Sequence, residues 1–462
     1  MVELHTNPGP GGRIGASLAG FVHEQFDPPV WEKAAICLVD ALGLAQIARG
    51  ENTTRAISDL ASRVAAEESG ARLWTRAIRA SLPEAVAANA VAVHAHFHDD
   101  SDPSSWCHPG SLIVPVSVAV AEAHGKGLRS VLRSIIAGYS TLNWLGDKEH
   151  VAHALINRGI RTSPALGTIG AAAAAAVGLG LDAQAAANAV AIAASITGGT
   201  LAPLGSGSDE WRVQNAQAAR GGLLAAQLAA NKVIGAISAL DGPKGLLKSL
   251  AGIETTPESW NEPLRPAAIL DTYAKPWATL GDNMAAVRAA KLMHDDGVDI
   301  DQIESVEVHI WRAYAEYPGT SFKGPFSAPV QALASTAFAT AAMLIRGDLE
   351  FDVSFSLRED ARILKLTQLV TVVPSDEGSK LDARLVVRLK DGTSRLRLAR
   401  QAPRTWLYHD TERSASVFEA RLQSSGYAPA AGRTFAADLF ALAGGSADLP
   451  IADFLDRLSP LG

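Results

Sequence analysis

The sequence has few of the residues that mark several common protein classes. Only two cysteines, Cys37 and Cys107, occur in 462 residues. This excludes a disulfide framework and a cysteine-rich zinc site, and it fits a reducing compartment. There is no tract of lysine and arginine, and the net charge is −7, which argues against nucleic acid as the main partner. With 19% charged and 48% hydrophobic residues, the chain can bury a large core and is not expected to be disordered.

The sequence also lacks a convincing leader or membrane span. Residues 1–15 are rich in glycine and proline and have no apolar region of the kind that defines a signal peptide. The most apolar run, 167–199, is made of alanine rather than leucine and contains Asp182. Alanine is too weakly apolar to make such a run a good span. We therefore expect a cytoplasmic protein with no membrane partner.

Helical patterns dominate the first 267 residues. Apolar side chains recur at helical spacing in 31–50, 54–67, 83–95, 112–124, 127–146, 164–178, 182–196, 210–231 and 243–250, and again in 415–425 and 434–457. Many of these stretches are rich in alanine and glycine, which lets helices approach one another closely. We predict one large all-helical domain over 1–267 that is completed by 401–462.

The pattern changes between the two helical parts. Residues 303–312, 364–373 and 383–399 alternate as strands do, and Asp391-Gly392 lies where a hairpin would turn. Helical stretches at 284–296 and 328–346 separate them. The sequence thus predicts a smaller α+β domain over 268–400, which we call the lid domain. The expected fold is mostly α with this α+β lid.

The densest polar cluster spans 94–111 and reads HAHFHDDSDPSSWCHPGS. It holds four of the 12 histidines and three aspartates, and alanine-rich apolar segments flank it on both sides. Polar groups placed between buried helices are costly unless they pair with one another. Catalysis is a common reason for such an arrangement, and a purely structural hydrogen-bonded network is the alternative.

Individual residues in this cluster suggest different chemistry. His94 and His98 would share one helix face and could bind a metal, but no third ligand and no Glu-based zinc motif accompanies them. We therefore predict no metal. His108 precedes Pro109-Gly110, and a histidine held in such a turn either faces a pocket as an acid or base, or caps the next helix.

Three cations lie outside the cluster at places that suit an anionic ligand. Arg161 directly precedes a predicted helix, whose N-terminus favours anions. Arg212 begins another helix and could bind a carboxylate through two hydrogen bonds, and Lys275 lies beside Pro276. Each could equally be an ordinary surface or helix-start residue.

Several blocks resemble, in order, the 2-methylcitrate dehydratase (MmgE/PrpD) family, which includes cis-aconitate decarboxylases and iminodisuccinate epimerases. The blocks are HAHFHDDSD…HPGSLIVPVSVAVAEA, SPALGTIGAAAAAAVGLGLDAQAAANAVAIAASITGG, AQAARGGLLAAQLAANKVIGAISALDGPKGLL, YAKPWATLGDN and SAPVQALASTAFATAAMLIRGDL. They cover nearly the whole chain. The resemblance implies a helical domain, an α+β lid, a pocket between them, a homodimer and no obligatory cofactor.

This chain would be a divergent member. Phe97 stands where the family usually has a carboxylate, and Ser101 replaces its threonine. Arg161 occupies the place of a histidine, and Trp211 that of a loop lysine. The His-Pro histidine is kept as His108 and the Lys-Pro lysine as Lys275. The two aromatic replacements favour a less anionic, more apolar ligand than typical members bind.

The resemblance implies chemistry that removes or shifts a proton next to a carboxylate. We expect a cofactor-independent, dehydratase-type lyase acting on a carboxylate-bearing small molecule; the alternatives are an epimerase or other isomerase, a decarboxylase, or a degenerate binding protein. The predicted catalytic residues are His108, Asp99, Asp100, Ser101 and Lys275. The predicted substrate-binding residues are His94, His98, Arg161, Arg212 and Tyr317.

Overall fold

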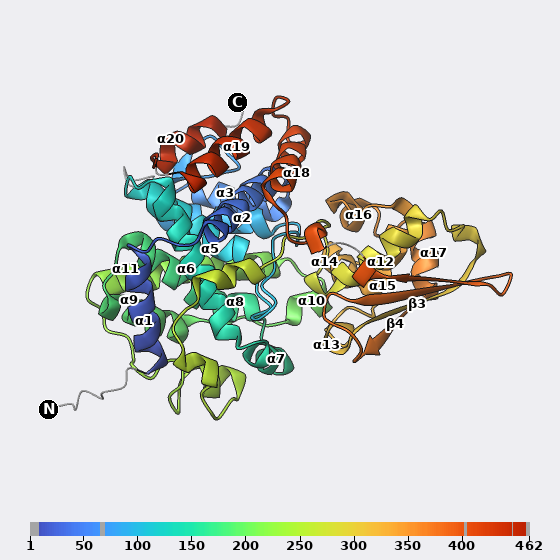
Figure 1. The fold of residues 1–462 in the computed structure, drawn as a ribbon, viewed down its shortest axis with the longest axis horizontal. Helices are drawn as coiled ribbons and strands as arrows, with labels where there is room; N and C mark the ends of the chain where they lie inside the picture. The colour runs from blue at the N-terminus through green and yellow to red at the C-terminus, as the bar shows by residue number, and fades with distance from the viewer. Residues whose placement is uncertain (1–8, 65–69, 402–403, 446, 459–462) are drawn as a thin grey trace.

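The computed structural model describes residues 9–64, 70–401, 404–445 and 447–458. Helices form a large domain and a smaller one contains the main sheet (Figure 1). The helices of the large domain are α1 (Pro10–Phe21), α2 (Pro28–Ile47), α3 (Asn52–Ala61), α4 (Leu82–His94), α5 (Pro109–Ala123), α6 (Leu128–Gly146), α7 (His150–Asn157), α8 (Thr162–Leu179), α9 (Ala183–Ile196), α10 (Ala202–Ser206) and α11 (Glu210–Ala230). Two short strands, β1 (Ala71–Arg72) and β2 (Arg79–Ala80), pair beside them. The mostly helical fold with an α+β domain is as predicted.

Helix α8 forms the centre of the large domain. It is the one described helix long and apolar enough to cross a membrane, but 94% of it is buried inside the protein, so its apolar composition is explained by core packing. A side chain at Gly222 of α11 would place its Cβ 2.5 Å from the Cβ of Ala171 and 2.6 Å from the carbonyl oxygen of Thr168. Glycine at 222 therefore allows α8 and α11 to pack at close range.

The C-terminal helices pack against the large domain. Helices α18 (Thr411–Ser424), α19 (Ala431–Gly444) and α20 (Ile451–Leu455) lie above α2 and α3 in Figure 1. Phe418 and Phe435 belong to the same buried core as Leu38 of α2. Arg421 donates a hydrogen bond of 2.7 Å to the carboxylate of Asp40. Residues far apart in the chain thus share one core.

The lid domain is built on a four-stranded sheet in the order β4-β3-β5-β6. Strand β3 (Ile303–Trp311) pairs in parallel with β4 (Val370–Ser375) and antiparallel with β5 (Ala383–Leu389), and β5 pairs antiparallel with β6 (Ser394–Leu398). Alternate side chains of β3 are buried in the lid core. The lid helices are α12 (Met284–Asp295), α13 (Arg312–Ala315), α14 (Pro329–Ala334), α15 (Thr336–Arg346), α16 (Phe351–Ser356) and α17 (Ala361–Leu369).

One strand prediction needs correction. Residues 364–369 are helical, and β4 begins only at Val370. The Asp360 carboxylate accepts hydrogen bonds from the backbone N–H groups of Arg362 and Ile363, which starts α17. Ile363, Leu366 and Thr367 are then buried at helical spacing. The cap and this spacing favour a helix over the alternation seen in the sequence.

The two domains meet through a third apolar cluster. Phe97, Leu201, Leu204 and Trp211 of the helical domain pack there against Ala278, Leu280, Val330, Leu333 and Ala334 of the lid. The lid core itself includes Tyr273 and extends to Leu407; the boundaries at 267/268 and 400/401 stay a prediction. The junction of the domains is where the 94–111 cluster lies.

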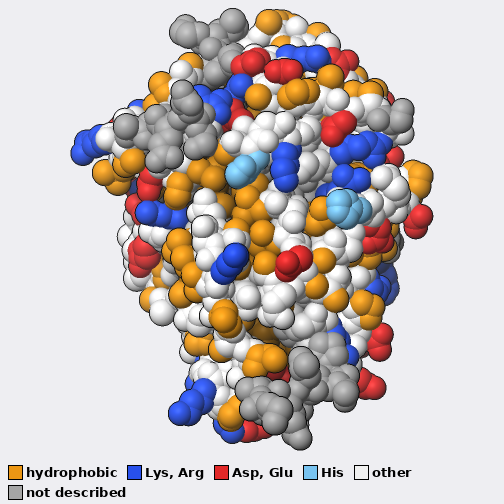
Figure 2. Space-filling model, turned by 90° about the vertical axis from the view of Figure 1, so that its left-hand side faces the viewer, with side chains coloured by type: hydrophobic (Ala, Val, Ile, Leu, Met, Phe, Trp, Pro, Cys, Tyr) orange, Lys and Arg blue, Asp and Glu red, His pale blue; other side chains and the backbone are white. Residues whose placement is uncertain are grey.

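The side of the helical domain that bears α1, α9 and α11 has a mixed surface. Figure 2 shows basic and acidic side chains scattered across this side, with apolar side chains gathered in a band between them. Five large apolar side chains of α9, α11 and the segment after α11 are exposed: Ile196, Leu224, Val233, Ile234 and Ile237. Ile234 and Ile237 are the most exposed, at 83% and 86%.

Candidate active site

A narrow cavity of about 40 Å³ lies where the two domains meet. The helical domain lines it with Phe97, Ser101, Asp102, Pro103, Trp106, His108, Arg161, Thr162 and Ser163, and the lid lines it with Tyr273, Leu280, Gly281, Asp282, Tyr314 and Tyr317. His108 is the N-cap of α5, and Arg161 is the N-cap of α8. The backbone N–H of His108 donates to Ser163 Oγ at 3.2 Å. The N-termini of both helices therefore converge on the cavity, which favours a bound anion.

The turn between α4 and α5 has an unusual backbone. Phe97 and Trp106 have φ values of 54° and 56°, a region that bulky residues seldom occupy and that costs about 1–3 kcal/mol for each. Lys275 Nζ donates to the carbonyl oxygen of Phe97 at 2.5 Å, and the Asp102 carboxylate accepts from Ser105 and Asn143. These bonds hold both aromatic rings in the cavity wall.

The ring of His108 has a defined tautomer. Its Nδ1 lies 3.0 Å from the carbonyl oxygen of Asp100, and a carbonyl only accepts, so Nδ1 carries the hydrogen. Ser101 Oγ is a further 3.4 Å neighbour of Nδ1. Nε2 is then left with a lone pair. Burial lowers the pKa of His108 well below its usual value, so the ring is neutral near pH 7 and can accept a proton.

Asp100 positions this histidine from behind. Its carboxyl group accepts from the Gly110 N–H at 2.6 Å and from Tyr139 Oη at 2.7 Å, and burial raises its pKa to about 7. A Cβ at Gly110 would lie only 2.9 Å from Asp100 Oδ1. Asp100 does not line the cavity. It fixes the carbonyl to which His108 is bonded.

Asp99, His94 and Arg161 form a buried relay. His94 Nε2 lies 2.6 Å from Arg161 Nη2, and because a guanidinium only donates, Nε2 accepts and Nδ1 carries the hydrogen. His94 Nδ1 is 2.8 Å from the Asp99 carboxylate. Arg161 Nη1 also donates to the carbonyl oxygen of Trp211 at 2.6 Å. The relay orients Arg161, whose side chain is the cationic wall of the cavity.

The structure thus brings part of the predicted set together. His108, Ser101, Arg161 and Tyr317 line the cavity, while Asp99, Asp100, His94 and Lys275 lie behind that wall, in contact with it. His98 is directed to the backbone of Lys275, and Arg212 donates to Ala95 O at 2.9 Å and to Asp209. Neither lines the cavity, so their roles in substrate binding stay predictions.

Other wall residues escaped the sequence analysis. Tyr273, Asp282 and Tyr314 come from the lid, and Trp106 lies inside the polar cluster. Burial raises the pKa of Asp282 to about 7, against the opposing charge of Lys275. Asp282 lies inside the YAKPWATLGDN block, but the sequence analysis assigned no role to it, and its place in the cavity wall is what reveals it.

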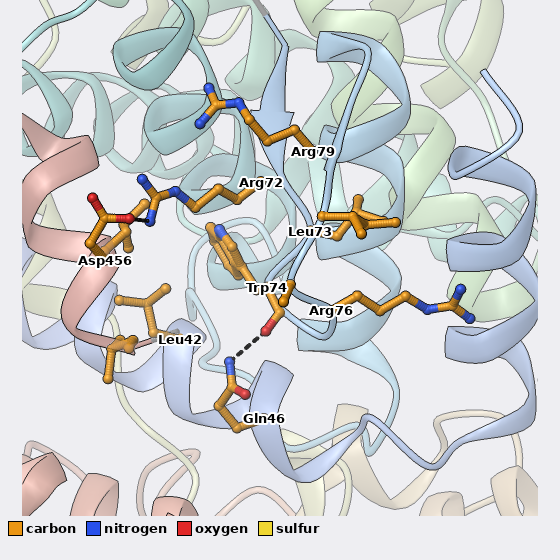
Figure 3. A pocket seen from close by; sticks show the side chains of 12 residues that line it. Leu42, Gln46, Arg72, Leu73, Trp74, Arg76, Arg79 and Asp456 are labelled. Atoms are coloured by element: carbon orange, nitrogen blue, oxygen red, sulfur yellow. Dashed lines mark hydrogen bonds and ion pairs between the residues drawn. The ribbon is translucent and has the colours of Figure 1, made fainter. Parts of the chain in front are cut away.

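Four larger cavities lie elsewhere among the described residues. One of about 400 Å³ is lined by lid residues such as His309 and Asp376, and one of about 220 Å³ by residues of α8, α9 and α11. The two others have tryptophan side chains in their walls. One of about 320 Å³ (Figure 3) is lined by Trp74, Gln46 and the arginines Arg72, Arg76 and Arg79. Each arginine is already paired: Arg72 with Glu122 and Asp456, Arg79 with Glu122, and Arg76 with Asp59. The other, of about 450 Å³, is lined by lid side chains such as Trp406 and shares Pro103, Tyr273 and Tyr314 with the narrow cavity. Neither of these two contains a histidine.

Comparison with known proteins agrees with this architecture. Residues 13–258 match the model of the MmgE/PrpD N-terminal domain, and residues 283–413 match that of the MmgE/PrpD C-terminal domain. The chain belongs to the MmgE/PrpD family. This member is 27% identical over 435 residues to the cis-aconitate decarboxylase-like protein oryM of Aspergillus oryzae (strain ATCC 42149 / RIB 40), an overlap of 84% of this chain and 86% of that protein.

Three residues that depart from the MmgE/PrpD pattern, Phe97, Trp211 and Arg161, lie in the cavity wall or directly behind it. Phe97 reaches the cavity, so the position of a usual carboxylate is apolar here. Trp211 is fully buried behind it, with ring centroids 4.8 Å from Phe97 and 5.0 Å from His94. Arg161 puts a permanent positive charge at the usual histidine position. Among the described residues, no group of three His, Cys, Asp or Glu side chains is arranged to hold a metal ion.

Proposed function

We propose that this protein is a lyase that removes a proton next to a carboxylate of a small hydroxy acid and releases water from the neighbouring carbon. The observation that supports it most is the pairing of a neutral base with a cation in one cavity. His108 has Nδ1 committed to a carbonyl and Nε2 available, and Arg161 stands at the N-terminus of α8 in the same wall. Membership of the MmgE/PrpD family supports a carboxylate substrate.

Each step is assigned to a group of this chain. Arg161 and the first backbone N–H groups of α8 bind the substrate carboxylate. His108 Nε2 first takes the proton from the adjacent carbon, and the electron pair of that bond is delocalised into the carboxylate; in a second step this pair forms the C=C bond as the C–O bond breaks. Lys275 and Arg161 offset the negative charge that develops on the carboxylate. The oxygen leaves with the electron pair of the C–O bond, assisted by a hydrogen bond from the Ser101 hydroxyl, and a proton from an acid of the cavity or from solvent converts it to water. His108 afterwards returns its proton to solvent.

Substrate entry needs movement of the lid. The cavity of about 40 Å³ has room for one or two water molecules, whereas small-molecule sites are several times larger. Its walls come from both domains, so it widens when the lid moves away from the helical domain. A cavity this small is what a closed lid would leave around the reacting groups, and closure would exclude water from the reaction.

Decarboxylation is the second candidate, because the relative named above is decarboxylase-like. In that reaction the bond to the carboxylate breaks, carbon dioxide leaves, and an acid protonates the remaining carbon. If His108 were that acid, it would have to begin the cycle protonated. Burial lowers the pKa of His108 and keeps its ring neutral, which agrees with the base that water loss requires. Epimerisation would need a second base and would leave the mass of the substrate unchanged.

The test is incubation with citrate, 2-methylcitrate, isocitrate, malate and cis-aconitate in deuterated water, followed by mass spectrometry. Loss of the mass of one water, or its gain by cis-aconitate, supports the proposal. Loss of the mass of carbon dioxide would instead indicate decarboxylation. Uptake of deuterium without any loss of mass would indicate epimerisation. His108→Gln should lower the rate by about 10²–10⁴-fold. His124→Gln, an exposed change at the other end of α5, is the matched control.

A further inference from the structure

Asp282 belongs to the lid, yet it shares a cavity with His108 of the helical domain. The two side chains therefore reach the cavity from opposite domains. Asp282 is partly buried. It is the acidic side chain of the lid in this cavity, and the roles assigned above leave it unused.

The backbone holds Asp282 firmly in place. Gly281 lies close to Tyr273 of the lid and to Ser101 of the helical domain: a Cβ at this position would lie 2.6 Å from Tyr273 Oη and 3.1 Å from Ser101 Oγ. On the other side, Asn283 is completely buried, donates to Thr279 Oγ1 at 2.8 Å and accepts from Thr336 Oγ1 at 2.6 Å. Both neighbours are thus fixed, so Asp282 is directed to the cavity by a rigid turn beside Ser101.

The groups that face Asp282 favour a retained proton. Lys275 lies behind the cavity wall and stabilises the ionised form, whereas the Glu149 carboxylate opposes it. The hydroxyl groups of Tyr273, Tyr314 and Tyr317 are neutral neighbours whose pKa values its charge raises further. Burial has the largest effect and raises the pKa of Asp282 to about 7. The carboxyl group can therefore carry a proton near neutral pH.

We infer that Asp282, which lines the cavity from the lid while His108 lines it from the helical domain, is the catalytic acid that protonates the leaving hydroxyl of the substrate. The inference rests on the function proposed above. The proton moves from the Asp282 carboxyl to the substrate oxygen, the C–O bond breaks with its electron pair on that oxygen, and water leaves. Asp282 ends as a carboxylate and His108 as an imidazolium. Exchange with solvent then returns the proton from the histidine to the aspartate, so the cycle balances.

The kinetic test separates the acid from the base. Asp282→Asn is assayed with whichever of citrate, isocitrate, malate or 2-methylcitrate the wild-type protein dehydrates fastest. Water loss should fall by about 10²–10⁴-fold. Exchange of the carbon-bound proton with deuterated water needs only His108 and should stay close to the wild-type rate. Asp282→Glu should restore part of the water loss, and the exposed lid variant Asp271→Asn should behave as wild type.

Two kinetic results would overturn the assignment. Unchanged water loss in Asp282→Asn would exclude an acid at this position, and equal loss of exchange and elimination would indicate a structural role. His108→Gln tests the proposed function separately from the role of Asp282. Full activity in that variant would contradict the proposed function itself. If the wild-type protein dehydrates none of these acids, the function and this assignment fail together.

A second measurement does not depend on turnover. In protein labelled with ¹³C at the aspartate carboxyl carbons, one resonance should titrate near pH 7 and be missing from Asp282→Asn. The corresponding signal of Asp100, which is also raised to about 7, should remain in that variant and be lost in Asp100→Asn. Absence of any such difference for Asp282 would show that it holds no proton to donate, which overturns the proposal.

Discussion

Lys275 Nζ lies 2.5 Å from the carbonyl oxygen of Phe97 and donates a hydrogen bond to it. This bond joins the first segment of the lid to the left-handed turn of the helical domain. Lys275 is 1% exposed, and burial lowers its pKa to about 8, so it stays mostly protonated near pH 7. The lysine that the motif suggested for catalysis is therefore also a link between the domains.

Replacement of Lys275 should destabilise the protein. Lys275→Met leaves the buried carbonyl of Phe97 without its donor, and we expect the free energy of unfolding to fall by about 1–3 kcal/mol. Denaturant unfolding measures it. Lys291→Met removes a lid lysine whose ion pair with Asp295 is at the surface, and that variant should change stability by less than about 0.5 kcal/mol. Equal stability of the two variants would show that the bond to Phe97 contributes nothing.

Arg161→Lys should weaken substrate binding while keeping the charge. A lysine cannot reproduce the guanidinium contacts with His94, Trp211 and Asn215 that orient Arg161. We expect KM to rise at least about tenfold, equivalent to about 1.4 kcal/mol, with a smaller effect on kcat. Steady-state kinetics on the acid found by the screen measure this. Arg158→Lys, at an exposed position three residues earlier, should leave KM unchanged; an unchanged KM in Arg161→Lys would rule out carboxylate binding there.

Asp100 should make stability depend on pH. Burial raises its pKa in the folded protein from 3.8 to about 7, so the native state binds the proton more tightly than the unfolded chain. This contribution is fully present below pH 3.8 and is lost as the pH rises through about 7. Between about pH 5 and pH 8, the free energy of unfolding of wild type should fall by about 1–3 kcal/mol relative to that of Asp100→Asn.

Denaturant unfolding of wild type and Asp100→Asn at both pH values checks this. The comparison between variants cancels the histidines, whose lowered pKa values act in the opposite direction. Asp391→Asn is the control, because hydrogen bonds from Thr393 lower the pKa of that exposed carboxyl and its contribution is constant above pH 5. If the free energy of unfolding changed by the same amount in wild type and in Asp100→Asn between the two pH values, the raised pKa of Asp100 would be contradicted.

The predicted homodimer has a suitable surface on the side that bears α9 and α11 (Figure 2). Ile234 and Ile237, in the segment after α11, are 83% and 86% exposed, and an exposed apolar patch is commonly covered by a partner. We propose that a second copy covers it. Ile237→Glu should convert a dimer into a monomer in sedimentation measurements, and Leu60→Glu, at an exposed position on α3, should not. A wild-type protein that sediments as a monomer would refute the proposal.

The sequence by itself determined the fold class and part of the site. Helical spacing and alternation are local signals, so they predicted the helical domain, the return of the C-terminal helices and the hairpin at Asp391-Gly392. The His-Pro-Gly motif and the cation before a helix start indicated His108 and Arg161, because a residue that caps a helix is fixed by its immediate neighbours. The family resemblance supplied the chemistry to expect from them.

Only the tertiary structure decided which side chains share the cavity. His94 and Asp99 are close to His108 in the chain, yet they lie behind the wall because Arg161 and the left-handed turn at Phe97 take its front. Asp282 reaches the cavity from the lid, since Gly281 lets the turn approach Ser101. No local pattern records such contacts: they depend on how two separately folded domains meet, and burial at that junction sets the protonation of the groups that act there.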